Sequence, residues 1–422
     1  MVPALDAWRI QLSGGLRAAA AHVTIGRPRT TLRSGLVVVQ TSLALVLLIG
    51  AGLLVNSLAR LGRVQPGFDP TDVVWLDVSL PARYADATSR LAFFDELMTR
   101  VRATAGVRSS GAIQGRPLGG GNAVSTVFPE GQLPTEGVRV PRVPFHAIAP
   151  GYFQTLGVPV IDGRDFGDDD RGSSPRAAIV SRAFASRFWP GERAVGKRFW
   201  IGRVAADAPL TEVVGVVEDV LQYGLGDAPQ PIVYRPFAQA PRNNLSVIVR
   251  HDGRAPAEVI ESLRQAAWSL DAALPLDVHG TMTGAIRDSI GEPRFRAVAV
   301  AIFSAIAAVL ACIGLYGTLA WIVRARRREL GIRMVLGADA GSLQRLVIRR
   351  GMTLALAGMA IGSAGAVAAS RLLQSLVFGI TTTDPLTFAS AIVAMATVML
   401  LACYLPARRA GKTDPVTTLR ID

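Results

Sequence analysis

The sequence predicts a membrane protein of the α+β class, in which four transmembrane helices carry a large extracytoplasmic α+β domain between helices 1 and 2. Three observations predict this fold. Four long stretches carry no charged side chain, and one long polar segment separates the first stretch from the second. Half of the 422 residues are hydrophobic while 18% are charged, a composition typical of membrane proteins.

The first transmembrane helix is predicted at residues 34–58, because a helix of this length crosses a hydrocarbon core of about 30 Å. The same criterion predicts the other three at residues 297–323, 351–370 and 386–405. Residues 59–296 are too polar for a bilayer, so we expect them to form a water-exposed domain of two lobes. The remaining segments are an N-terminal segment, a loop between helices 2 and 3, a short outer loop and a C-terminal tail: residues 1–33, 324–350, 371–385 and 406–422.

The distribution of charge predicts on which side of the membrane each segment lies. Residues 59–296 hold 27 of the 45 basic and 26 of the 32 acidic side chains, so the rest of the chain holds 18 basic and 6 acidic ones. Residues 324–350 alone contain eight arginines. Because Lys and Arg favour the cytoplasmic side, we expect both termini in the cytoplasm and the large domain outside. The first apolar stretch is too long and begins too late for a cleavable signal peptide.

The net charge of +13 does not indicate a nucleic-acid partner. The excess lies next to predicted membrane helices, where it orients them and meets anionic lipid headgroups, whereas the large domain is nearly neutral. The bilayer is therefore the expected partner of these charges. Cys312 and Cys403 both fall in predicted membrane helices, so no disulfide framework is expected in the large domain.

Within the large domain, strand-like and helix-like patterns alternate. Residues Val73–Leu80 alternate apolar and polar side chains as a half-buried strand does. Residues 115–144, rich in Gly and Pro, are expected to lack regular structure. Two βα units flanking a strand-rich middle suggest one α+β lobe with a second lobe inserted into it. Further strands are expected at Ala177–Ser181, Glu212–Val217, Leu245–Arg250 and Leu276–His279, and helices at Ser89–Ala105, Arg182–Phe188 and Ala255–Ser269.

No constellation of residues indicates catalysis, a metal site or a bound cofactor in this chain. A phosphate-binding loop needs a glycine five residues before Gly411-Lys412-Thr413, and that position is Pro406. The acidic run Asp165, Asp168, Asp169 and Asp170 lacks the spacing of a calcium loop, so we interpret it as a solvated turn. The histidines are scattered along the chain: His22, His146, His251 and His279. We expect this chain not to be an enzyme.

Two glycines of the third predicted helix, Gly358 and Gly362, are one turn apart. Small residues at this spacing let another helix approach closely. The pattern fits a contact between two subunits or a contact within one subunit.

Several motifs resemble one family of membrane proteins. The segments Arg164–Phe166, Ala194–Arg198 and Glu212–Val220 resemble the periplasmic core domain of MacB-like ABC transporter permeases. The run RRELGIRMVLGA at residues 327–338 is similar to the cytoplasmic signature of the FtsX-like permease domain. Three further segments resemble the second half of the duplicated orphan permeases of acidobacteria: Arg33–Gln40, Gly50–Leu54 and Pro66–Pro70.

The resemblance implies a multi-pass permease subunit of the bacterial inner membrane, without catalysis of its own. A separate ABC ATPase subunit that holds ATP-Mg would bind its cytoplasmic face, and helix motion would reach the periplasmic domain for export or mechanotransmission. It also implies a homodimer or pairing with a second permease half, and a possible periplasmic adaptor. The ATPase-coupling residues would be Arg327, Arg328, Glu329, Leu330, Gly331, Ile332, Arg333, Met334 and Gly337.

The residues themselves leave two interpretations of the cytoplasmic loop open. Leu343, Leu346 and Val347 recur at helical spacing among polar residues, which predicts an amphipathic helix that leads into the third membrane helix. Such a helix can lie on the membrane surface or bind a partner; the resemblance favours an ATPase. The alternatives for the whole chain are a membrane-anchored sensor or scaffold without an ATPase partner, and a half-length orphan permease.

Overall fold

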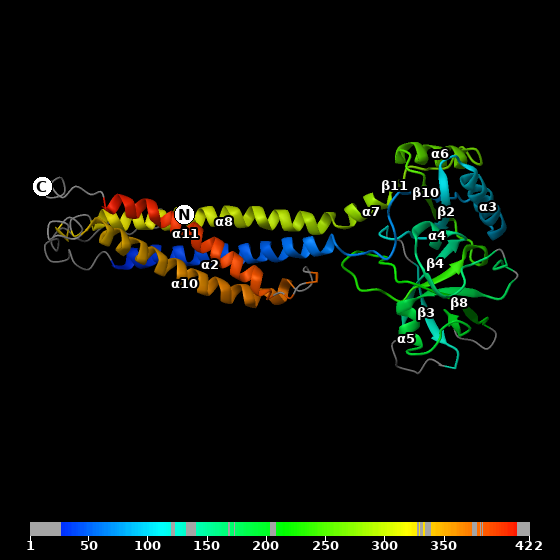
Figure 1. The fold of residues 1–422 in the computed structure, drawn as a ribbon, viewed down its shortest axis with the longest axis horizontal. Coiled ribbons are helices and arrows are strands. Elements are labelled where there is room, and N and C mark those ends of the chain that lie inside the picture. The colour runs from blue at the N-terminus through cyan, green and yellow to red at the C-terminus, as the bar shows by residue number, and fades with distance from the viewer. Residues whose placement is uncertain are drawn as a thin grey trace, which may run out of the picture. The chain divides into compact units, whose positions relative to one another are not determined.

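The chain forms two compact units, which a computed structural model describes separately (Figure 1). The helical unit comprises Met1–Ala59 and Pro293–Asp422, and the large domain comprises Arg60–Glu292. The structure describes residues 27–119, 123–131, 141–167, 169–172, 174–202, 208–326, 329, 332–333, 339–373, 378–379, 381 and 383–411.

Within the described residues, the helical unit contains four long helices: α2 (Arg27–Leu61), α8 (Gly291–Ala325), α10 (Ala340–Leu373) and α11 (Pro385–Gly411). Each contains a stretch long and apolar enough to cross a membrane. Each helix also extends beyond the apolar stretch that predicts it, because charged residues at its ends continue the helix and hydropathy detects only the apolar part. Four such helices and an α+β domain between the first two confirm the predicted fold class.

The helical unit has a core that all four helices share. Its buried side chains include Leu45 and Leu53 of α2, Leu315 of α8, Met359 of α10 and Met399 of α11. Many of the outward apolar side chains are exposed, as expected of residues that face lipid. Examples are Phe295, Ile302, Phe303, Ile313, Leu386, Val393 and Leu401.

The first lobe of the large domain is a split βαβ arrangement. Its sheet runs in the order β11-β1-β10-β2, and every neighbouring pair is antiparallel. The chain order β1-α3-β2 and β10-α6-β11 gives the two βα units that the sequence predicts. The elements are β1 (Val73–Ser79), α3 (Ala87–Ala103), β2 (Val107–Ile113), β10 (Asn244–His251), α6 (Pro256–Trp268) and β11 (His279–Thr281), followed by α7 (Met282–Ser289).

Strand β1 is buried on both faces, which corrects the expectation of a half-buried strand. Val74, Leu76 and Val78 share a core with residues of α3 and α6. Val73 and Trp75 belong to a second core that includes Met282 of α7. The sequence pattern could not show the second core, because its other members come from distant segments that include the inserted lobe, β10 and α7.

The inserted lobe lies between β2 and β10 and closes into a ring of strands. Its order is β4-β3-β7-β8-β6-β9, and β9 pairs with β4 to close the ring. Pairing of β2 with β4 joins the two lobes into one sheet. The elements are β3 (Ala123–Pro129), β4 (Arg142–Ala149), α4 (Tyr152–Leu156), β5 (Val160–Gly163), β6 (Ala177–Ser181), α5 (Arg182–Phe188), β7 (Arg198–Ile201), β8 (Thr211–Val217), β9 (Val233–Pro236) and the 3₁₀ turn η2 (Phe237–Gln239).

Two further expectations for the large domain were wrong. Residues 115–144 contain β3 and the start of β4, although the Gly- and Pro-rich composition disfavours strands. Pairing between β3 and β4 stabilises both strands there. The last strand is His279–Thr281 and not Leu276–His279, because pairing with β1 begins at His279. Leu276 instead belongs to the core that α3 and α6 share with the sheet.

Candidate functional site

The first candidate site is the N-terminal part of α10, which includes the predicted amphipathic helix. Asp339 caps this helix: its carboxylate accepts a hydrogen bond from Gly341 N at 3.1 Å. Leu343 and Val347 are buried, whereas Arg345 and Arg349 are exposed. One face of α10 therefore packs inside the helical unit while the other presents positive charge.

A small cavity of about 70 Å³ lies beside this part of α10. Its walls are apolar residues of α8 and α10, among them Ile322 and Leu346, with Arg326 and Arg350 at its sides. This end of α8 and α10 is therefore a groove with apolar walls and two cationic side chains.

The predicted coupling segment lies partly within the described residues. Glu329, Ile332 and Arg333 are helical and exposed, and Arg333 Nη2 donates to Glu329 Oε1 at 2.8 Å. Arg326 lies 3.7 Å from the other carboxylate oxygen of Glu329. The other predicted coupling residues lie outside the described residues: Arg327, Arg328, Leu330, Gly331, Met334 and Gly337.

The two glycines of α10 face α2 of the same chain. A Cβ atom at Gly358 would lie 2.7 Å from Thr41 Cβ, and one at Gly362 would lie 2.8 Å from the carbonyl oxygen of Ser42. Both helices need these glycines for their close approach. Sequence reasoning missed Gly351, where a Cβ atom would meet Leu319 and Cys403, since its partners lie on two other helices.

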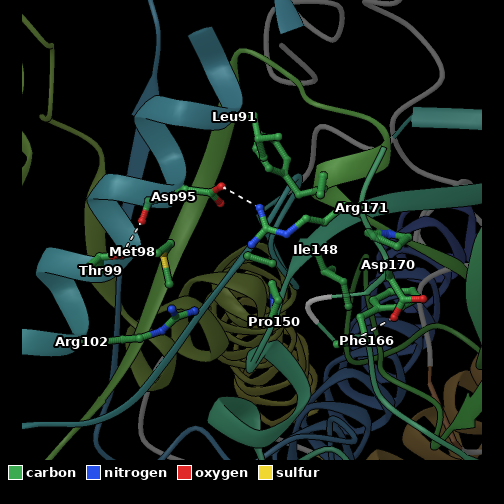
Figure 2. Close-up of a pocket in the computed structure, with 15 residues that line it drawn as sticks. Leu91, Asp95, Met98, Thr99, Arg102, Ile148, Pro150, Phe166, Asp170 and Arg171 are labelled. Carbon is green, nitrogen blue, oxygen red and sulfur yellow. Dashed lines mark hydrogen bonds and ion pairs between the residues drawn. The ribbon is translucent and has the colours of Figure 1, made fainter. Parts of the chain in front are cut away.

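The second candidate site is a cavity of about 360 Å³ in the large domain, shown in Figure 2. Its floor is apolar and buried, with Met98 of α3, Ile148 of β4, Phe166 and Phe237. Polar side chains surround this floor: Asp95, Thr99, Arg102, Asp170 and Arg171. A concave apolar surface with a few polar groups is typical of ligand sites.

An ion pair crosses this cavity between the two lobes. Arg171 Nη1 lies 3.6 Å from a carboxylate oxygen of Asp95 on α3, as Figure 2 shows. Because both side chains are about half exposed, the pair contributes little to stability. This ion pair is therefore a weak contact between the two lobes.

The acidic loop beside this cavity is built from hydrogen bonds. Arg164 binds both carboxylate oxygens of Asp170, at 2.7 and 3.0 Å, and Gly167 N donates to the same carboxylate at 2.9 Å. The bond from Arg164 lowers the pKa of Asp170. Burial raises the pKa of Asp165, whose carboxylate accepts from Phe166 N at 2.7 Å. Because Asp170 is buried, the expectation of a solvated turn was wrong for this residue.

Sequence reasoning singled out the acidic loop but not the cavity. The cavity combines residues from α3, from the end of β4, from the loop after β5 and from η2. These segments are distant in the sequence, and pairing of β2 with β4 brings them together. No local spacing signals such a site.

Two family models match the chain. The MacB-like periplasmic core domain matches residues 34–266, and the FtsX-like permease C-terminal domain matches residues 301–415. Each match covers one of the two regions where motifs resemble this family.

Similar proteins include ATP-binding/permease proteins and an ABC transporter permease. The macrolide export ATP-binding/permease protein MacB of Marinobacter nauticus is 26% identical over 270 residues, which cover 62% of this chain and 40% of that protein. The uncharacterized ABC transporter permease YknZ of Bacillus subtilis is 23% identical over 290 residues, covering 66% and 70%. The pyoverdine export ATP-binding/permease protein PvdT of Pseudomonas aeruginosa is 24% identical over 446 residues, covering 98% and 59%.

Among solved structures, the periplasmic region of MacB from Actinobacillus actinomycetemcomitans aligns with this chain at 14% sequence identity and a TM-score of 0.36. The alignment covers 53% of this chain and 94% of the solved chain. The chain spans less than half the length of several MacB relatives that it matches.

Proposed function

This chain belongs to the family of MacB/FtsX-like ABC transporter permeases, and from that membership we propose that it is the permease subunit that couples a separate ATPase to its large domain. The subunit would act in export or mechanotransmission. Relatives named ATP-binding/permease proteins support the assignment to an ABC transporter. In this proposal a partner subunit binds ATP-Mg and hydrolyses ATP, and this chain does not.

One observation carries this proposal: α10 is a single helix from its exposed basic face to its apolar span. Its 34 residues rise about 51 Å, well above the hydrocarbon thickness of about 30 Å. A protein that binds the end near Arg345 and Arg349 can therefore move the membrane part of the same helix. The helical residues Glu329 and Arg333 precede this end and add an exposed charged surface.

The charge distribution supports the orientation that belongs to this function. Residues 324–350 and the N- and C-terminal segments would lie in the cytoplasm, and the large domain would lie in the periplasm of a bacterial inner membrane. The ATPase would then approach α10 from the side on which ATP is present.

The assembly we propose contains at least two permease units. The motifs at Arg33–Gln40, Gly50–Leu54 and Pro66–Pro70 resemble half of a duplicated permease, so the second unit is either another copy of this chain or a second permease half. A periplasmic adaptor could bind the large domain.

Purification from the native membrane in mild detergent tests the proposal. We expect an ATPase to co-purify with the wild-type chain and to be lost from the double variant E329A/R333A. The charge-swapped variant E329R/R333E keeps an ion pair but exchanges the positions of the two charges. It therefore separates loss of helix stability from loss of a binding surface. A binding role predicts that the swapped variant also loses the ATPase.

A matched control exists in the large domain. Glu96 and Arg100 of α3 form the same i, i+4 pair at the same distance of 2.8 Å. E96A/R100A should leave ATPase recovery unchanged. If no ATPase accompanies any of the four proteins, the coupling proposal is wrong and the sensor or orphan-permease alternative replaces it.

A further inference from the structure

A second cavity of the large domain, of about 190 Å³, opens at the ends of three strands of the first lobe. Its walls are the end of β1, the turn that follows β2 and the start of β10. Most of its polar side chains are neutral, with Ser79, Asn244 and Ser246 among them, whereas Asp77 and Arg116 carry opposite charges. The position of Arg116 decides what this cavity can bind.

The guanidinium of Arg116 is held in place before any ligand arrives. Its Cζ atom lies 3.5 Å from the centre of the Trp75 ring, within cation–π contact. A Cβ atom at Gly119 would lie only 2.7 to 2.9 Å from Arg116 Cγ, Cζ and Nη1. The side chain therefore lies between an indole ring and a glycine that leaves room for it.

Two nitrogen atoms of this guanidinium lack a hydrogen-bond acceptor in the part of the chain that the structure describes. Among the described residues, its Nε and Nη1 are buried and have no hydrogen-bond partner. The carboxylate of Asp77 lies 3.9 Å from Nε, too far for a hydrogen bond, and the same oxygen already accepts from Ser246 Oγ at 2.5 Å. Burial lowers the pKa of Arg116, and the charges of Asp77 and Asp288 oppose this shift.

We propose that this cavity binds the carboxylate group of a small organic ligand or of a peptide C-terminus, with Arg116 as its anchor. Because Nε and Nη1 are buried, Nη2 is the donor that the exposed 14% of the Arg116 side chain can offer to an oxyanion in the cavity. The volume resembles that of an engineered cavity of about 150 Å³ that binds benzene, so it suits a group the size of one amino-acid residue.

The charges around Arg116 favour a carboxylate over a phosphate. Asp77 and Asp288 both act on the guanidinium, so negative charge already surrounds the cation. A singly charged carboxylate meets less repulsion there than a phosphate that carries about two charges at neutral pH. Ser79 and Asn244 can donate to the ligand without adding charge.

Calorimetric titration of the full chain in detergent tests this site with defined probes. We expect N-acetylalanine to bind saturably, and N-acetylalaninamide, its uncharged analogue, to bind at least tenfold more weakly. Inorganic phosphate should also bind more weakly than N-acetylalanine. A hexapeptide with a free C-terminus that binds more tightly than N-acetylalanine identifies a peptide as the source of the carboxylate, and the reverse identifies a small free acid.

Two variants and one control assign the binding to Arg116. Arg116→Met should weaken N-acetylalanine binding at least tenfold, and Gly119→Ala should do the same by displacing the guanidinium. Arg108→Met removes an exposed arginine of β2 that lines neither cavity and should leave binding unchanged.

Equal binding of the acid and its amide to the wild-type chain, no saturable binding of the acid, or tighter binding of phosphate would each overturn the proposal. That comparison needs no variant, so it decides the matter even if Arg116→Met does not fold. The site lies in the large domain, so its test does not depend on whether an ATPase binds the helical unit.

Discussion

The contacts inside the helical unit are of a different kind from the contacts inside the large domain. In the helical unit, α10 approaches its neighbours at Gly351, Gly358 and Gly362, where a Cβ atom would collide with the facing helix. In the large domain, aromatic clusters fill the cores: Phe94 meets Phe93 and Phe237 edge-on, with ring centres 5.5 and 5.2 Å apart.

This difference follows from the solvent that surrounds each unit. Water drives apolar side chains of the large domain into its cores, so large rings contribute most there. Lipid is as apolar as the side chains of the helical unit, so its helices depend on close fit and not on burial from water. Substitutions that remove volume should therefore damage one unit, and substitutions that add volume should damage the other.

The largest expected effect is that of Phe94→Ala. Phe94 is 1% exposed in the core between α3 and the sheet, and its loss should lower the free energy of unfolding of the large domain by about 3 to 5 kcal/mol. Urea denaturation of the full chain in detergent, followed by tryptophan fluorescence, measures this. Phe295→Ala is the control, because Phe295 of α8 is 74% exposed and should change stability by less than about 0.5 kcal/mol. Equal losses would show that burial in the core is not what makes Phe94 important.

Added volume should have its effect in the helical unit. Gly362→Ala places a Cβ atom 2.8 Å from the Ser42 carbonyl oxygen and should cost about 1 to 3 kcal/mol. Gly35→Ala in α2 is the matched change, because no atom lies within 4 Å of its added methyl group. The thermal midpoint in detergent should fall for the first variant and stay level or rise for the second. A fall of equal size in both would point to the helix backbone and not to the α2–α10 contact.

The ion pair between Arg164 and Asp170 makes the stability of the large domain depend on pH. Arg164 lowers the pKa of Asp170 in the folded protein below its value of about 3.9 in the unfolded chain. The pair therefore stabilises the large domain at pH values above the unfolded pKa. This contribution is lost as the pH falls through the folded pKa. Asp170→Asn should be less stable than wild type at pH 7, and the difference should shrink below pH 4. Denaturation at pH 7, 4 and 3 measures it. A difference that stays constant with pH would assign the effect to packing.

The smallest effects on stability belong to the exposed ion pairs. Removing Glu96–Arg100 or Glu329–Arg333 should change the free energy of unfolding by no more than about 0.5 kcal/mol. If E329A/R333A loses its ATPase while its thermal midpoint stays at the wild-type value, the residues act as a binding surface. A drop of many degrees in the midpoint would instead assign them a structural role.

The sequence predicts the parts of the fold that depend on local patterns. Uncharged apolar stretches locate the four long helices, and Ala177–Ser181 and Arg182–Phe188 coincide with β6 and α5 because buried β-branched residues precede a helical spacing. Strands β5, β7 and β9 have four residues each, too few for a periodic pattern. The ring they help to form depends on pairings between distant segments.

The candidate sites also divide into one that a local sequence pattern predicts and others that depend on contacts between distant segments. Glu329 and Arg333 are four residues apart, so their pairing follows from helix geometry alone. The cavity beside Asp95 and Arg171 exists only because the two lobes share a sheet, and their sequence separation gives no signal of contact. Arg116 lies in a glycine-rich turn, where its contact with Trp75 of β1 cannot be read from spacing.

The pairing of β1 with β11 has a mechanical consequence. β1 follows α2 and β11 leads through α7 into α8, so a force that separates the two membrane helices pulls on the same end of this antiparallel pair. Such a load breaks hydrogen bonds one after another, as in a zipper, and not all together. β11 contributes three residues, whereas β1 is held to β10 over seven. β11 would therefore be the first strand of this lobe to separate under tension, and the buried Met282 of α7 would resist the next step.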